Sequence, residues 1–114
     1  MSTASSPYDL ASLWRFFLLF YLLFWLQNFL QILVPTYTSL NYRTGICGYG
    51  CSDHASWTEV GIPAICTAEA GPFGDVNPEM HSADDDIDLF DAEFSLEFAK
   101  LALGMVVELA QYDP

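Results

Sequence analysis

The most informative stretch of the sequence is residues 47–57, which read CGYGCSDHASW. Its two cysteines, Cys47 and Cys51, are separated by three residues, two of which are glycines that permit a tight turn. Such a loop suits a disulfide, but two thiols or a metal site would fit the same spacing, although zinc sites usually take a second ligand pair. The third cysteine, Cys66, lies in a short apolar run, and we expect it to be a small buried side chain that keeps its thiol.

Several short elements are expected on the C-terminal side of this stretch. Ser52 is placed to cap a short helix over residues 53–60, and Gly61 suits the position after the end of that helix. The apolar run 62–67 is bounded by turn residues and predicts a buried strand. Residues 69–78 are rich in glycine and proline and predict a loop.

A longer helix is predicted over residues 94–109. Its apolar side chains recur at helical spacing and form one broad stripe, so the helix is expected to pack on a sheet or on another helix. The acidic residues 84–86, which precede it, are typical of a solvated loop, because the glycine and final glutamate of an EF-hand calcium loop are missing. The stripe consists of Phe94, Phe98, Leu101, Met105 and Leu109.

An apolar run occupies the N-terminal side of the sequence. Residues 16–26 are all apolar, and the stretch 16–34 is interrupted only by three amide side chains, so it is long enough for a membrane span. A cleaved signal and a buried helix are the alternatives, and features of a signal peptide are poor. Pro35 is expected to stop or kink the helix. Of the two fates of the leader, we favour collapse onto apolar protein surface over insertion into lipid.

The composition excludes some classes of function. The chain has 114 residues and a formal net charge of -12, with 14 of its 15 acidic residues between Asp53 and Asp113. The length suits one domain. Three basic residues cannot form the basic surface that a nucleic-acid-binding protein needs, and they cannot form a polybasic lipid-binding patch. The two histidines, His54 and His81, lie in no recognisable catalytic motif, so the residues alone do not assemble an active site.

The stretch 47–57 nevertheless resembles the C-G-Y-x-C-S-D-H-x-S-W segment of the leucyl-aminopeptidase-like zinc peptidases, which include bacterial secreted aminopeptidases and fungal peptide hydrolases. Further segments resemble the same family in the same order. Residues 61–64 are similar to its G-x-P-A strand entry, and residues 77–85 to its N-P-x-I-H-T-x-x-D segment. Residues 93–109 look like its C-terminal helix, and residues 29–40 like the helix before the cysteine pair. The resemblance covers about residues 26–112.

The resemblance implies an α/β fold, namely the C-terminal part of a three-layer α/β/α sandwich with a mixed sheet. It also implies secretion and the removal of N-terminal residues from peptides by two zinc ions, which polarise the scissile carbonyl and activate a water molecule. By resemblance, His81 is a zinc ligand, and Cys47 and Cys51 form a disulfide. The remaining roles carried over are an oxyanion-stabilising hydroxyl at Tyr49, an aromatic wall of the substrate pocket at Phe73, and orienting positions at Ser52 and Asp85.

The sequence also departs from this family. An H-x-D motif, a Glu-Glu pair and a further aspartate supply the family's other ligands and its general base, and none of them is present here. We therefore expect residues 26–114 to be the C-terminal portion of a zinc aminopeptidase domain that is inactive alone, preceded by an apolar leader, residues 1–25. The alternative is a small membrane-anchored or interaction protein that retains a peptidase-derived segment. The expected partners are a peptide substrate and, through residues 16–34, a membrane.

Overall fold

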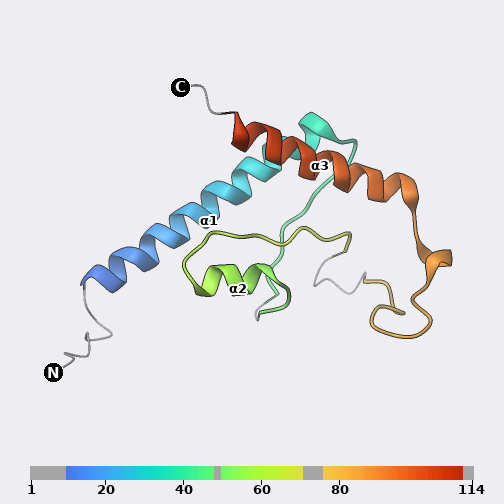
Figure 1. The fold of residues 1–114 in the computed structure, drawn as a ribbon, viewed down its shortest axis with the longest axis horizontal. Coiled ribbons are helices and arrows are strands. Elements are labelled where there is room, and N and C mark those ends of the chain that lie inside the picture. Colours follow the sequence, from blue (N-terminus) through green and yellow to red (C-terminus); the bar gives the residue numbers. More distant parts are fainter. Residues whose placement is uncertain (1–9, 48–49, 71–75, 112–114) are drawn as a thin grey trace. The chain divides into compact units, whose positions relative to one another are not determined.

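The computed structural model describes residues 10–47, 50–70 and 76–111 (Figure 1). Regular structure within these ranges is entirely helical, and no strand occurs in them. The elements, in chain order, are α1 (Leu10–Tyr37), α2 (His54–Glu59), the 3₁₀ helix η1 (Ile87–Leu89) and α3 (Ala92–Ala110).

The chain divides into two compact units. Unit 1 comprises the described residues of Met1–Asn28 and Gly48–Cys66. Unit 2 comprises those of Phe29–Cys47 and Thr67–Pro114. Unit 1 therefore holds the first part of α1 and all of α2, whereas unit 2 holds the last part of α1, η1 and α3.

The expected α/β fold with a mixed sheet is wrong for the part of the chain that the structure describes. The predicted strand, residues 62–67, has no regular secondary structure. A strand satisfies its backbone N–H and C=O groups only through a neighbouring strand, and the sequence offers few other runs suited to that role. α3 packs on a helix, which is one of the two partners expected for it from the sequence.

α3 confirms the helix predicted over residues 94–109 and extends it slightly at both ends. It begins after Asp91, whose Oδ1 accepts a hydrogen bond from the backbone N–H of Phe94 at 3.0 Å and so satisfies one of the open donors of the first turn. Its apolar stripe supplies the core of unit 2. Leu101 is buried with Leu33 and Val34 of α1, and Met105 packs against them.

The end of α1 tolerates a proline. Pro35 was expected to stop or kink the helix, yet α1 continues to Tyr37. The backbone N–H of Thr38 still reaches the Val34 carbonyl at 2.9 Å, and the Thr36 hydroxyl donates to the Ile32 carbonyl at 2.7 Å. These bonds satisfy the Val34 and Ile32 carbonyls, whereas Pro35 has no N–H to donate to the carbonyl four residues before it, that of Gln31.

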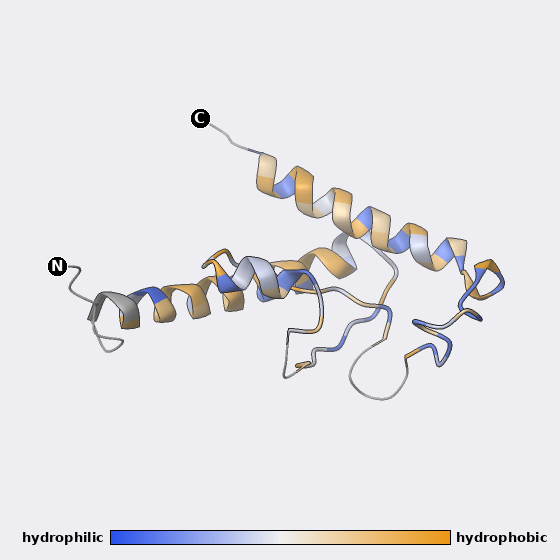
Figure 2. Cartoon of the chain, turned by 60° about the horizontal axis from the view of Figure 1, so that its bottom comes forward, coloured by the Kyte–Doolittle hydropathy of each residue, from blue (hydrophilic) through white to orange (hydrophobic). Residues whose placement is uncertain are grey.

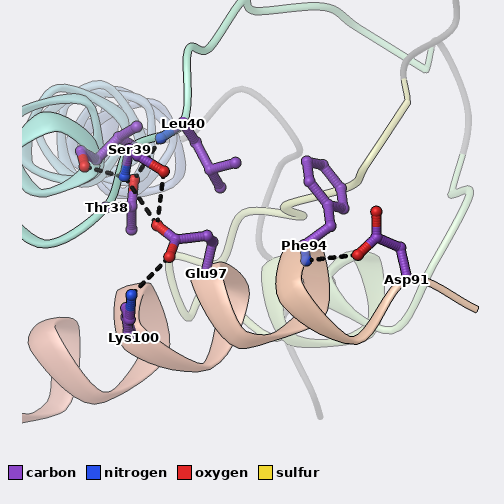
Figure 3. Close-up of polar contacts among 8 residues, drawn as sticks. Thr38, Ser39, Leu40, Asp91, Phe94, Glu97 and Lys100 are labelled. Carbon is purple, nitrogen blue, oxygen red and sulfur yellow. Dashed lines mark hydrogen bonds and ion pairs between the residues drawn. The ribbon is translucent and has the colours of Figure 1, made fainter.

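Polar contacts join the segment after α1 to α3 within unit 2 (Figure 3). Glu97 Oε2 accepts from the backbone N–H of Ser39 at 2.8 Å, and its Oε1 lies 2.6 Å from Lys100 Nζ. The ammonium of Lys100 and the hydrogen bond from Ser39 hold the pKa of Glu97 below its usual value. The hydroxyl of Tyr37 donates to Glu108 one helical turn from Gly104.

In unit 1, α2 ends as predicted but begins differently. Gly61 adopts a φ of 84°, and the backbone N–H groups of Gly61 and Ile62 bond to the carbonyls of Thr58 and Trp57, both at 3.0 Å. This pattern is a Schellman motif, for which glycine is favoured at positive φ. At the other end, Asp53 occupies the N-cap position rather than the predicted Ser52, and its side chain makes no capping hydrogen bond.

The first part of α1 is covered far less than the last part. Figure 2 shows apolar residues dominating α1, whereas apolar and polar residues alternate along α3. In unit 1 the aromatic side chains of this helix are exposed, and only Leu26 is buried among residues 13–28. Most side chains of this segment therefore lie exposed rather than against protein in unit 1.

Candidate functional site

The predicted zinc ligand His81 lies in a tightly bonded loop, residues 77–85 of unit 2. Asn77 holds the loop through both ends of its amide: Nδ2 donates to Asp85 Oδ1 at 3.1 Å, and Oδ1 accepts from the backbone N–H of Glu79 at 2.9 Å. The hydroxyl of Ser82 donates to the Glu79 carbonyl at 2.6 Å. Side chains therefore fix the backbone on both sides of His81, although no regular element does so.

His81 has a strained backbone and an exposed side chain. Its φ is 68°, which makes it the one residue other than glycine with positive φ in the described ranges. This conformation costs on the order of 1–3 kcal/mol for such a residue, although histidine is among the types that adopt it more often. The hydrogen bonds of Asn77 and Ser82 maintain it. The loop therefore holds a strained backbone conformation at a residue whose imidazole is exposed to solvent.

The structure brings no second zinc ligand to His81. Among the described residues, no group of three or more histidine, cysteine, aspartate or glutamate side chains could hold a metal ion. The other histidine, His54, lies in α2 of unit 1, and its Nδ1 is buried without a hydrogen-bond partner in the described part of the chain. The residues that the structure describes therefore do not fit the zinc centre that the resemblance implies.

The other predicted site residues are placed in part. Cys47 and Cys51 are disulfide-bonded, whereas the thiol of Cys66 is not in a disulfide and is exposed rather than buried. Ser52 is exposed, and its carbonyl accepts from the backbone N–H of Ala55 at 3.0 Å at the start of α2. Tyr49 and Phe73 lie outside the described residues.

A cleft of about 460 Å³ in unit 2 was not foreseen from the sequence. The loop contributes Asn77, Met80 and Asp85, and α3 contributes Phe94 and Phe98, whose rings meet edge to face at 5.3 Å between centroids. The sequence placed both aromatics in the stripe that packs a core. Their spacing of four residues predicts that the two side chains lie on the same face of the helix, but it does not show whether that face lines a core or a cleft.

The chain resembles known peptidases over most of its length. The model of Peptidase family M28 matches residues 24–106. Probable leucine aminopeptidases of Arthroderma benhamiae and Arthroderma otae are 45% and 46% identical to it over 84 and 85 residues, which is 74% and 75% of this chain and 23% of each relative.

Leucine aminopeptidase 1 of Aspergillus clavatus is 41% identical over 85 residues, covering 75% of this chain and 22% of that protein. The chain thus spans about a quarter of the length of these curated relatives. No solved structure matches it.

Proposed function

This chain belongs to peptidase family M28, and on that premise we propose that residues 26–114 are the C-terminal portion of a zinc aminopeptidase domain that does not hydrolyse peptides by itself. The observation that carries the proposal is the position of the bonded loop 77–85 within the family match. The exposed His81 in that loop is the residue that the family resemblance makes a zinc ligand. In this proposal the chain supplies one ligand of a centre whose other ligands it does not contain.

The loop geometry suggests how the chain's own residues would serve such a centre. Asp85 and Asn77 close the loop, so their hydrogen bond positions the backbone that carries His81. Changing a residue that orients a ligand in this way typically lowers metal affinity or activity by about 10–100-fold. This role agrees with the orienting position that the resemblance gives to Asp85. Ser52 is proposed for a similar role, although its side chain is exposed.

The remaining roles are proposals from the resemblance. Tyr49 would stabilise an oxyanion from the small loop closed by the Cys47–Cys51 disulfide. Phe73 would form an aromatic wall of the pocket for the first side chain of a peptide. The disulfide supports a secreted or otherwise oxidising location, since disulfides persist in such compartments. The metal chemistry itself would require zinc to polarise the scissile carbonyl, which these residues cannot arrange on their own.

An activity assay of the purified chain tests the proposed inactivity. We expect no release of leucine from a chromogenic leucyl amide, with or without added zinc, because the chain lacks the Glu-Glu pair that supplies the family's general base. The matched control is His81→Ala, which removes the proposed ligand. Zinc-dependent release by the unaltered chain that the control lacks would contradict the proposal.

A further inference from the structure

The first part of α1 exposes apolar side chains around more than half of its circumference. Phe16, Phe20 and Phe24 follow one another at helical spacing, and Tyr21 and Leu18 continue the exposed surface around the helix. At ~100° per residue these exposed side chains cover an arc of roughly 200°. Phe20, near the middle of the segment, is 66% exposed. No charged residue occurs between Phe16 and Tyr42.

The covered side of this segment is also apolar. Leu19, Leu22 and Leu26 are buried or half-buried on that side, and Leu19 and Leu22 line a cleft beside α2 within unit 1. No residue of α2 is buried, so α2 shields this helix only lightly. Residues 16–26 of the segment are therefore apolar all round, which is the pattern of a helix surrounded by apolar material rather than of one packed along a single stripe.

The all-round apolar surface and the polar ends of the segment fit a lipid bilayer better than a protein groove. The helix rises about 18 Å between Arg15 and Gln27, so the side chains at both ends reach toward the surfaces of a hydrocarbon core that is ~30 Å thick. A protein partner would cover an arc of only ~100°, and lipid covers every face. Trp14 and Arg15 lie near one end, and Trp25 with the amides of Gln27 and Asn28 lies near the other. Tryptophan and side chains that reach for water are common at both membrane interfaces.

From these features we propose that residues 10–28 of α1 insert into a lipid bilayer and anchor the chain to it. The change from exposed to docked helix falls at the boundary between the two units, Asn28 to Phe29. The part of α1 that packs on α3 therefore stays outside the bilayer, and the core of unit 2 is kept. Because Cys47 and Cys51 are disulfide-bonded, the residues after the anchor lie on the oxidising side of the membrane.

Cell-free synthesis of the full chain with endoplasmic reticulum microsomes tests the anchor. We expect the chain to remain in the membrane pellet after alkaline carbonate extraction, at its uncleaved mass, with the residues after the anchor protected from added protease. Release by carbonate would overturn the proposal. A shortened product free in the lumen would also overturn it, because it would make the segment a cleaved signal.

A charge substitution separates insertion from surface adsorption. Phe20→Arg places a charge near the middle of the segment, and insertion scales for such a charge predict a fall of about tenfold or more in the carbonate-resistant fraction. Leu103→Arg is the matched control, because Leu103 in α3 of unit 2 is similarly exposed, at 65%, and lies outside the segment and outside unit 1. We expect Leu103→Arg to leave the membrane fraction unchanged. An unchanged membrane fraction for Phe20→Arg would overturn the proposal.

Discussion

The two parts of α1 have similar apolar content and opposite environments. In the last part, Leu33 is 3% exposed and packs with Leu101 of α3. In the first part, Leu18 is 47% exposed, and most of its aromatic neighbours are exposed as well. The difference shows that apolar residues do not by themselves make a protein core. A core requires a partner segment that offers a complementary apolar stripe, small residues where the backbones approach closely, and matching polar contacts.

α3 provides that match for the last part of α1. Gly104 is buried against Tyr37, and a Cβ atom built on it would lie 2.7 Å from Cδ2 of the tyrosine ring. The absence of a side chain therefore allows the two helices to approach closely. About two helical turns before Gly104, Glu97 accepts a hydrogen bond from the backbone N–H of Ser39 and forms an ion pair with Lys100. The bond to Ser39 fixes the chain as it leaves α1.

The largest expected effect is that of truncating the buried leucine. Leu33→Ala should lower the free energy of unfolding of unit 2 by about 2–5 kcal/mol, because it removes transfer energy and leaves a cavity. The same truncation in the first part, Leu18→Ala, should change it by less than about 0.5 kcal/mol. Urea unfolding of both variants under identical conditions measures the contrast. Equal effects would mean that the two parts of α1 are packed alike.

A smaller effect is expected where the helices approach most closely. Gly104→Ala should destabilise unit 2 by about 1–3 kcal/mol, because the added methyl group overpacks the contact with Tyr37. In an exposed helix the same change would stabilise by up to about 1 kcal/mol, so the sign of the effect is informative. Combining it with Tyr37→Ala should reduce the penalty, since the two residues are in contact. A stabilising Gly104→Ala would contradict the close approach.

The smallest expected effect is a pH dependence from Glu97. Because its pKa is lowered in the folded chain, its contribution to stability is present above the unfolded-state pKa and is lost as the pH falls through the folded-state pKa, below the usual 4.5. Thermal unfolding of the chain and of Glu97→Gln across this acidic range measures the contribution. We expect the two curves to converge at the acidic end. Curves that stay parallel throughout would exclude this role for Glu97.

Local patterns predicted the helices well and the strand poorly. The helical spacing of apolar residues in 94–109 predicted α3, and Gly61 followed by Pro63 predicted the end of α2. Both predictions succeeded because helices depend mainly on interactions between residues close in sequence. The prediction of a strand at residues 62–67 was wrong. A short apolar run forms a strand only when another strand lies beside it, and the spacing of residues within the run does not show whether such a neighbour exists.

Prediction of the site was limited in a similar way. The role of His81 as a zinc ligand stays a prediction from the family resemblance. Its positive φ could not be predicted, because it follows from the hydrogen bonds of Asn77 and Ser82. Such bonds depend on how the loop closes, and no periodic pattern in the sequence predicts them. The cleft between this loop and α3 likewise depends on packing between distant segments, so Phe94 and Phe98 appeared in the sequence only as core residues.

A chimera tests most directly whether this chain carries the functional C-terminal portion of an M28 peptidase. Residues 26–106 would replace the matching segment of the Arthroderma benhamiae probable leucine aminopeptidase, which is 45% identical over the aligned residues. We predict that the chimera hydrolyses a leucyl amide. We also predict that His81→Asn, which tolerates the positive φ, lowers its kcat/KM by more than about 100-fold, whereas the control His54→Asn does not. A folded but inactive chimera, or a His81→Asn chimera as active as its parent, would contradict the account.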